Sequence, residues 1–358
     1  MKKFYIYYPI LFLIFFFLFD KIFLHPLFHK KFVQDGNIVF YVHREQLFAR
    51  MQKKRNKANT KKLLVAFGDS RAYPFSKRFM KPEQSKIWDL YNFSGPQAVP
   101  AYSYFWLQRM VRAKIVPERI FFVVSPEGFD DKKSLMHKPF LRMASTDEFA
   151  IENWSNIPKS DRYEFLVDKL IALRSVDLDY KLFWERWKSD TLLQYDPKYN
   201  AKIAVLNLYQ GEYFGYTKAK QKEELERDAQ RLANIYFYNF AIHETQFVYT
   251  EKLLALAEKH SSKVVVIWPK VYPTYGKKYQ FLRLKDGSTL NLRKTWGGRM
   301  KKLVEKYGML YIDMNQSSDC KLFYDASHQS GLCFPKQMQQ IFALYEKNES
   351  EENKKSEP

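Results

Sequence analysis

Short apolar runs, separated by stretches with helical periodicity, dominate the hydrophobic pattern of the chain. The runs lie at Leu63–Phe67, Ile87–Phe93, Arg119–Ser125, Lys263–Pro269 and Met309–Met314. Consecutive apolar positions over such short runs are typical of strands buried on both faces of a parallel sheet. Helical patterns lie between several of the runs, as at residues 245–260 and 292–308. The alternation predicts an α/β fold with a five-stranded parallel sheet and helices on both faces.

The alternation is interrupted between the third and fourth predicted strands. Residues 131–245 are rich in Trp, Tyr and Lys, contain helical patterns and lack a convincing buried strand. We interpret them as a helical insertion, which divides the α/β domain into residues 63–130 and 246–346. An insertion that leaves near the carboxyl ends of the strands either covers a site there or only adds stability at the periphery.

The N-terminus carries a long apolar segment, Phe4–Leu24, interrupted by the polar pair Asp20 and Lys21. A membrane-spanning helix needs roughly 20 mainly apolar residues, so residues 1–24 are predicted to form a single membrane anchor. A cleaved signal peptide, the alternative, typically has a shorter apolar core and a small-residue cleavage site. Lysines flank the segment on both sides, so the positive-inside rule does not fix its orientation.

Polar segments follow the anchor and end the chain. Residues 25–62 are interpreted as a basic connector, in which Asn37–Val42 is a candidate strand and the residues after it are partly helical. Residues 347–358 contain few apolar side chains, and such composition predicts disorder.

The formal net charge of +20 is spread over the whole chain. It either reflects a solvated basic surface or attracts anionic lipid headgroups and glycans. The sequence lacks zinc-finger spacing, an RNP-like run and a compact basic helix, so no nucleic-acid partner is expected. No cofactor or metal is expected either, because glycine-rich phosphate loops and His/Cys clusters with ligand spacing are absent from the sequence.

The first apolar run ends in Gly68, Asp69 and Ser70. Ligands of parallel α/β sheets bind beyond the carboxyl ends of the strands, which is where this sequence places the Ser70 hydroxyl. A helix beginning at Ser70 would direct its free N–H groups to the same place. By itself the tripeptide is more typical of a helix N-cap than of a nucleophile.

Asp325 and His328, near the C-terminus, supply the other parts of a serine hydrolase site. A serine nucleophile needs a base, and the base needs an acid that orients it. The spacing of two intervening residues allows the carboxylate to reach Nδ1 of the imidazole and leaves Nε2 for Ser70. Gly95, after the second predicted strand, and the N–H of Ser70 are candidate oxyanion donors, although Gly95 is also compatible with an ordinary turn.

The two cysteines, Cys320 and Cys333, bracket Asp325 and His328. They either form one disulfide that closes a short loop in an oxidising compartment or are two unrelated small apolar residues.

These motifs resemble the SGNH (GDSL) hydrolase superfamily, over residues 63–130 and 246–345. The resemblance implies a flavodoxin-like three-layer α/β/α fold and esterase, lipase, deacetylase or acyltransferase activity. By position, Ser70 matches the nucleophile, Gly95 an oxyanion donor, His328 the base and Asp325 the residue that orients it.

The third block of the superfamily normally supplies an asparagine to the oxyanion hole, and this chain departs from that pattern. Here the third run ends in Ser125, Pro126 and Glu127. An ionised glutamate accepts hydrogen bonds but does not donate them, so either a backbone N–H, Ser125 or Asn92 substitutes, or activity is low or absent. A Glu127 charge in the site would disfavour an oxyanion, and Glu127→Asn is expected to raise esterase activity.

The anchor, the third block and the insertion are similar to the DltD/AlgJ branch of SGNH-like proteins and to an uncharacterised spirochaetal family of single-anchor SGNH-like proteins. The first resemblance implies an extracytoplasmic or periplasmic domain that acts on cell-envelope glycan or lipid beside a membrane-bound O-acyltransferase. A membrane-anchored esterase or acyltransferase is the first hypothesis. A glycan O-deacetylase and a catalytically silent scaffold that binds a glycan or an acyltransferase are the alternatives.

Overall fold

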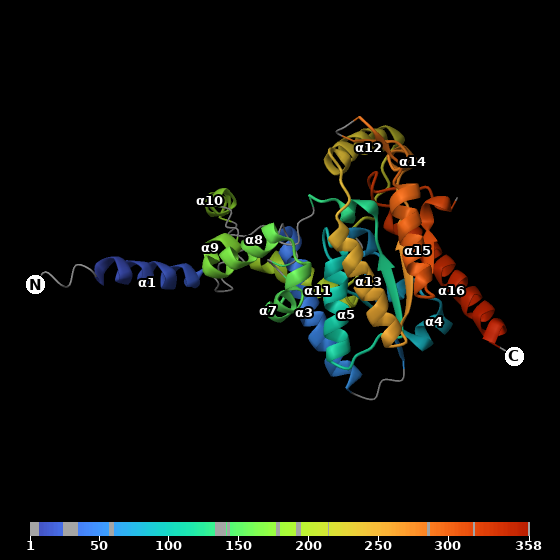
Figure 1. Cartoon of the computed structure of the whole chain (residues 1–358), viewed down its shortest axis with the longest axis horizontal. Coiled ribbons are helices and arrows are strands. Elements are labelled where there is room, and N and C mark those ends of the chain that lie inside the picture. The colour runs from blue at the N-terminus through green and yellow to red at the C-terminus, as the bar shows by residue number, and fades with distance from the viewer. Residues whose placement is uncertain are drawn as a thin grey trace, which may run out of the picture. The chain divides into compact units, whose positions relative to one another are not determined.

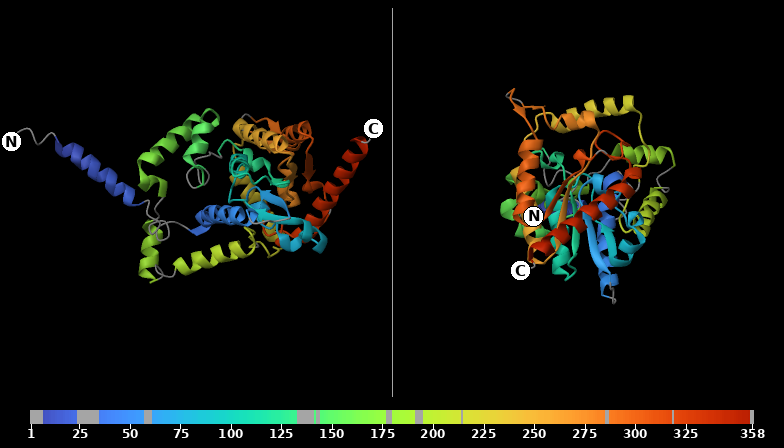
Figure 2. Two further views of the ribbon diagram at one scale, coloured as in Figure 1. Left: turned by 90° about the horizontal axis from the view of Figure 1, so that it is seen from below. Right: turned by 90° about the vertical axis from the view of Figure 1, so that its right-hand side faces the viewer.

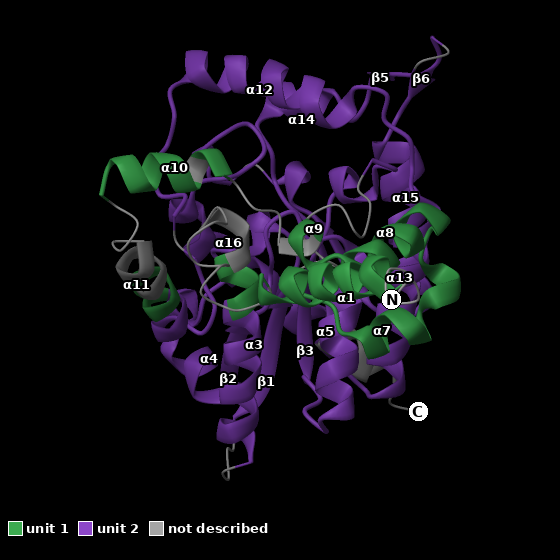
Figure 3. Cartoon of the chain, turned by 90° about the vertical axis from the view of Figure 1, so that its left-hand side faces the viewer, with its two compact units in different colours: residues 1–42, 135–205 green, residues 43–134, 206–358 purple. Residues whose placement is uncertain are grey.

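The computed structural model describes residues 7–23, 35–56, 61–132, 141, 144–176, 180–190, 195–213, 215–284, 287–317 and 319–356 (Figure 1). The chain divides into two compact units (Figure 3). Unit 1 consists of residues 1–42 and 135–205, and unit 2 of residues 43–134 and 206–358. The divisions fall inside helices α3 (Asp35–Arg55) and α11 (Tyr195–Leu208). Unit 2 therefore extends beyond the predicted α/β domain at residues 43–62 and 206–245.

A five-stranded parallel sheet forms the centre of unit 2, which confirms the predicted sheet. Its strands are β1 (Lys62–Phe67), β2 (Trp88–Asn92), β3 (Arg119–Val123), β4 (Lys263–Trp268) and β7 (Leu310–Asp313). They are ordered β2-β1-β3-β4-β7, and all pairs are parallel. In the register, Ala66 of β1 lies between Asn92 of β2 and Phe121 of β3. All five carboxyl ends therefore meet at one edge.

Helices cover both faces of this sheet. On one face, Leu64, Phe121 and Val265 belong to a core that includes side chains of α16 (Phe334–Ser356), drawn in red in Figure 2. On the other face, α5 (Pro100–Arg112) and α13 (Glu244–Lys259) pack side by side (Figure 1). Burial of apolar surface on both faces explains why the strands are apolar at consecutive positions.

Unit 2 also contains further helices, turns and a hairpin. They are η2 (Ser70–Ala72), η3 (Lys77–Phe79), α4 (Pro82–Ile87), η4 (Pro126–Phe129), α12 (Lys222–Phe237), α14 (Pro273–Lys277), the hairpin β5 (Leu282–Arg283) and β6 (Thr289–Leu290), η6 (Arg293–Gly297), α15 (Gly298–Lys306), η7 (Met314–Gln316) and η8 (Gly331–Cys333).

Unit 1 is helical. Its described elements are α1 (Tyr7–Ile22), α7 (Asp147–Glu152), η5 (Trp154–Asn156), α8 (Lys159–Leu170), α9 (Ala172–Val176), α10 (Tyr180–Lys188) and the first part of α3 and of α11. Within the part of the chain that the structure describes, no helix is both long and apolar enough to cross a membrane. Residues 1–6 and 24 of the predicted anchor lie outside the described residues.

Two expectations for the polar segments were wrong. Asn37–Val42 is not a strand but part of α3, because Phe40, Leu47 and Met51 are buried at helical intervals. The expected disorder of residues 347–358 is not found either, since α16 continues to Ser356. Residues 347–356 contain no Pro or Gly, which favours continuation of the helix. Residues 25–34, 57–60, 357 and 358 lie outside the described residues.

Candidate active site

Ser70, His328 and Asp325 meet at the carboxyl edge of the sheet. Ser70 Oγ lies 2.8 Å from Nε2 of His328, within hydrogen-bond distance. Nδ1 of the same ring lies 3.0 Å from both carboxylate oxygens of Asp325. The structure therefore brings together, across 258 positions of sequence, the nucleophile, base and orienting acid that the motifs predicted.

Steric contact and a local cap place Ser70 at the end of β1. Gly68 has a φ of +140°, and a Cβ at this position would lie 2.6 Å from the carbonyl oxygen of Val123. Any side chain there would be strained and would push β3 away from the turn. The Asp69 carboxylate accepts a hydrogen bond from Arg71 N–H at 2.9 Å. The element that follows is the short 3-10 turn η2 rather than the longer helix that the sequence suggested.

The Asp325 carboxylate organises the loop that carries the base. Its Oδ1 accepts hydrogen bonds from the backbone N–H groups of Ser327 and His328, both at 2.8 Å. The Ser327 hydroxyl adds a further bond at 3.0 Å. Burial raises the pKa of Asp325, but the charge of His328 and these hydrogen bonds lower it more, so the pKa lies below its usual range. The carboxylate is therefore ionised at neutral pH and holds the ring with Nε2 toward Ser70.

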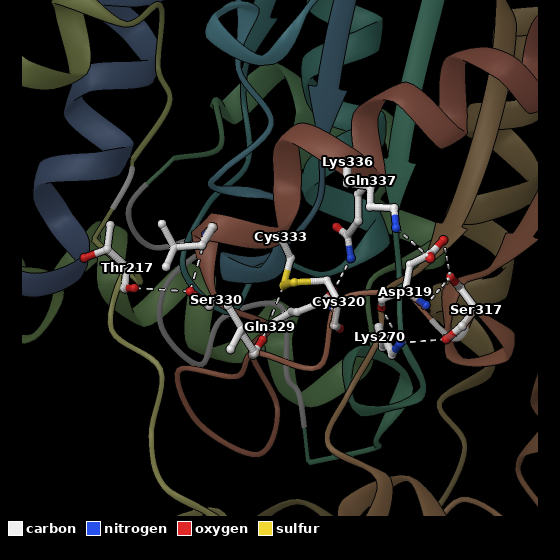
Figure 4. Close-up of a disulfide and its surroundings, with 12 residues drawn as sticks. Thr217, Lys270, Ser317, Asp319, Cys320, Gln329, Ser330, Cys333, Lys336 and Gln337 are labelled. Carbon is white, nitrogen blue, oxygen red and sulfur yellow. Dashed lines mark hydrogen bonds and ion pairs between the residues drawn. A yellow bond between two sulfur atoms is a disulfide. The ribbon is translucent and has the colours of Figure 1, made fainter.

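A disulfide closes the base loop, as one of the two readings of the cysteines predicted. Cys320 and Cys333 are bonded, with a Cα–Cα distance of 5.6 Å (Figure 4). Within the loop, Gln329 Nε2 donates to the Cys320 carbonyl at 2.7 Å. Lys270, which follows β4, donates to the carbonyls of Ser317 and Asp319, both at 2.6 Å. The Lys270 bonds attach the residues just before the loop to the end of β4, and Gln337 of α16 donates to Gln329 within the loop. These contacts limit the movement of His328.

Gly95 and Asn92, the two candidate donors at the end of β2, form other hydrogen bonds. Gly95 N–H donates to the Gly68 carbonyl at 3.0 Å. Asn92 is buried, and its amide donates to the carbonyls of Ala72 and Phe75 at 2.7 and 3.0 Å. Both residues brace the turn that carries Ser70. Asn92 is therefore a structural residue, and the structure does not place it as a site donor.

The third block binds Arg71, the residue after Ser70. The guanidinium of Arg71 donates to Ser125 Oγ and forms an ion pair with Glu127, with Nη2 2.9 Å from Oε1 and Nη1 3.1 Å from Oε2. The hydroxyls of Tyr275 and Tyr279 also donate to Oε1, both at 2.8 Å. Nε of Arg71 is buried and has no hydrogen-bond partner.

The Arg71–Glu127 pair corrects the expectation that Glu127 adds an uncompensated negative charge to the site. Burial raises the pKa of Glu127, but Arg71 and the hydrogen bonds lower it more, so the carboxylate is ionised and paired. The same pairing raises the pKa of Arg71 despite its burial. The Glu127 carboxylate is therefore neutralised by the Arg71 guanidinium rather than free in the site.

Residues 215–221, which the sequence did not single out, pack against the loop that carries His328. The carbonyl of Tyr216 accepts a hydrogen bond from Gly331 N–H at 2.7 Å. The carbonyl of Thr217 accepts one from Ser330 Oγ at 3.2 Å (Figure 4). The Tyr216 ring lies 4.8 Å from the His328 ring, between centroids. The only sequence signal was the high aromatic content of the insertion, which did not distinguish this tyrosine from the others.

The space beside the nucleophile is small. A cavity of about 10 Å³ is lined by residues that include Ser70, Arg71, Tyr216, Lys270, His328 and Gln337. This is about the size that holds one water molecule.

Comparison with known families places the chain. Residues 1–345 match the model of a family described as "Protein of unknown function (DUF1574)". The chain belongs to this family. No curated protein matches the chain.

This DUF1574 member has the groups needed for nucleophilic catalysis at one place. A hydroxyl is hydrogen-bonded to an imidazole that an ionised carboxylate orients. Arg71, a buried cation with one unpartnered N–H, lines the same cavity as Ser70. Among the described residues, no group of three His, Cys, Asp or Glu could hold a metal ion.

Proposed function

We propose that this protein is an SGNH-type serine ester hydrolase or O-acyltransferase. The observation that carries the proposal is the 2.8 Å contact between Ser70 Oγ and His328 Nε2, with Asp325 on the opposite ring nitrogen. The strand order of the sheet is the flavodoxin-like one, which supports the same superfamily. Because fold alone does not determine function, the proposal depends on the site.

In the first half of the reaction, His328 Nε2 takes the proton of Ser70 as Oγ attacks the carbonyl carbon of an ester. His328 then gives this proton to the leaving alkoxide, and the acyl group stays on Ser70. In the second half, His328 removes a proton from water or from an acceptor hydroxyl, which attacks the acyl-serine. The proton returns to Oγ, and Asp325 stabilises the imidazolium in both halves.

Arg71 takes the place of the missing asparagine. The Ser70 N–H belongs to the proposed nucleophile itself, and Arg71 lines the same cavity as Ser70 and His328. A buried N–H without a partner is costly, and the unpartnered Nε of Arg71 would gain a partner when an oxyanion forms. Glu127, Tyr275 and Tyr279 hold the guanidinium in position for this role.

Transfer to a polymeric acceptor fits the site better than rapid hydrolysis of small esters. The cavity beside Ser70 is about 10 Å³, and Tyr216 covers one face of the base. We therefore expect weak hydrolysis of small activated esters, with full activity when an envelope glycan, a lipid or a membrane-bound O-acyltransferase engages the site.

The proposal includes attachment to a membrane through the N-terminal segment and exposure of unit 2 to an oxidising compartment. The large apolar side chains of α1, such as Phe12, Phe15 and Leu18, are exposed. Without another protein surface against them, lipid is the environment in which they are stable. The disulfide supports the oxidising compartment, because such bonds persist outside the cytosol.

Labelling with a serine-directed fluorophosphonate tests the proposed activity. Wild-type protein should form a covalent adduct on Ser70, whereas Ser70→Ala and His328→Gln should not. A folded wild-type protein that forms no adduct would contradict the enzyme hypothesis. It would favour the catalytically silent scaffold. The hydrogen bond from Gly95 N–H to the Gly68 carbonyl is also compatible with that alternative.

A further inference from the structure

Helix α8 in unit 1 has an apolar face that is exposed. Tyr163, Leu166 and Leu170 occur at helical intervals, and their exposed fractions are 65%, 51% and 63%. The opposite face of the same helix, with Asp161 and Phe165, is buried. The helix therefore packs against protein on one side and presents a continuous apolar stripe on the other.

Helix α10 repeats this arrangement with aromatic residues. Tyr180, Trp184 and Trp187 lie on one face at intervals of four and three residues, with exposed fractions of 65%, 55% and 61%. Lys181 and Lys188 are exposed beside them, and Nζ of Lys188 lies 5.6 Å from the centroid of the Trp184 ring. Exposed Trp and Tyr flanked by lysine are typical of the interface between a bilayer and water.

The polar pair that interrupts the apolar N-terminal segment attaches α1 to the end of the α8 stripe. Asp20 is buried and accepts hydrogen bonds from the N–H groups of Ala172 and Leu173, at 2.6 and 2.9 Å. It thus caps the N-terminus of α9. Lys21 donates to the carbonyl of Leu170 at 2.6 Å and thus caps the C-terminus of α8. Two residues that would disturb a membrane helix are therefore used where α1 meets α8.

From these observations we infer that unit 1 is a membrane-interface module, in which the stripes of α8 and α10 lie in the headgroup region of a bilayer with anionic lipids. The inference rests on the membrane attachment included in the proposed function. The apolar surface of α1 continues to Leu170 through the Lys21 contact, so a bilayer that surrounds α1 also meets α8. The lysines of α10 and the net charge of +20 match anionic headgroups.

Depth-dependent fluorescence quenching tests this inference on the full chain in vesicles of zwitterionic and anionic phospholipid. Both native cysteines are disulfide-bonded, so a thiol-reactive fluorophore attaches only to an introduced cysteine. The probe sites are Leu166→Cys on α8 and Trp187→Cys on α10. Phe15→Cys on α1 reports the attachment itself. Tyr238→Cys in unit 2, whose side chain is 69% exposed, is the matched control.

The probes at positions 166 and 187 should be quenched several-fold more than the probe at 238 by lipids that carry nitroxide near the headgroup. Quenching at position 187 should weaken when the anionic lipid is omitted. Equal quenching at 166, 187 and 238, with strong deep quenching at 15, would overturn the inference and leave the attachment intact. An emission shift at 166 that depends on protein concentration but not on lipid would show a contact between copies of the chain and would also overturn it.

The outcome is independent of the catalytic proposal, because fluorophosphonate labelling of Ser70 is measured on the same preparations. Labelling without interfacial quenching would contradict the module alone. Interfacial quenching without labelling would contradict only the catalytic part of the proposed function. Absence of quenching at position 15 would remove both the attachment and the module.

Discussion

The groups proposed as base and oxyanion donor, His328 and Arg71, are held in different ways. Around His328, a disulfide and the hydrogen bonds of Asp325 fix a loop whose partners are close in sequence. Around Arg71, one buried ion pair joins residues 56 positions apart. The first arrangement is preorganised by local contacts, whereas the second depends on the packing of β3 and of the segment that carries Tyr275 and Tyr279. Variants on each side should therefore fail in different ways.

The largest effect is expected for Asp325→Asn on the base side. The amide cannot stabilise the imidazolium and favours the wrong tautomer of His328. The rate constant of fluorophosphonate labelling should fall by up to about 10⁴. Asp319→Asn is the matched control, because Asp319 lies in the same region but pairs with Lys336, at 2.9 Å. Equal rates for Asp325→Asn and wild type would show that the carboxylate only shapes the loop.

On the oxyanion side, Arg71→Met should lower the labelling rate by about 10²–10³, the usual effect of losing one oxyanion donor. The single variant leaves the buried Glu127 carboxylate without a cation, which destabilises the fold. The double variant Arg71→Met/Glu127→Gln removes both charges and keeps the site neutral. Wild-type labelling by the folded double variant would contradict the role assigned to the guanidinium.

Glu127→Asn separates the structural account from the expectation based on sequence. The sequence predicted a gain of esterase activity, because an asparagine would restore a donor. The structure instead predicts a loss, since the buried Arg71 would lose its closest carboxylate and keep only Asp69, at 3.7 Å, at a cost of about 3 kcal/mol of stability. Thermal unfolding and nitrophenyl acetate hydrolysis distinguish the two. A stable variant with higher activity would favour the earlier expectation.

Reduction of the Cys320–Cys333 bond should lower the free energy of unfolding by about 3 kcal/mol, because the bond restricts the unfolded chain across a sequence separation of 13. Denaturant unfolding with and without a reductant measures this, and the Cys320→Ser/Cys333→Ser variant should match the reduced protein. Labelling of Ser70 should also slow, since His328 is then held only by hydrogen bonds. Identical unfolding curves in both conditions would contradict a stabilising role for the bond.

The sequence predicted those parts of the molecule that depend on local pattern. The apolar run Leu63–Phe67 became β1, and Asp325 and His328 met through a spacing that is readable in one short motif. Ser70 could be joined to them because parallel strands bring their carboxyl ends to one edge.

The parts that could not be predicted depend on packing between distant segments. Nothing near Arg71 indicates that its partner is Glu127, and nothing near Tyr216 indicates that it covers His328. Asn37–Val42 resembles a strand in isolation. It is helical because Phe40, Leu47 and Met51 are buried with the period of a helix rather than that of a strand.

The most direct test of the account is to trap the acyl-enzyme. Wild-type protein is mixed with nitrophenyl acetate, quenched in acid at short times and examined by intact-mass and peptide mass spectrometry. The account predicts a mass increase of one acetyl group, located on Ser70 and absent from Ser70→Ala. An acetyl group on another residue, or none on Ser70 in folded wild-type protein, would contradict the claim that Ser70 is a catalytic nucleophile.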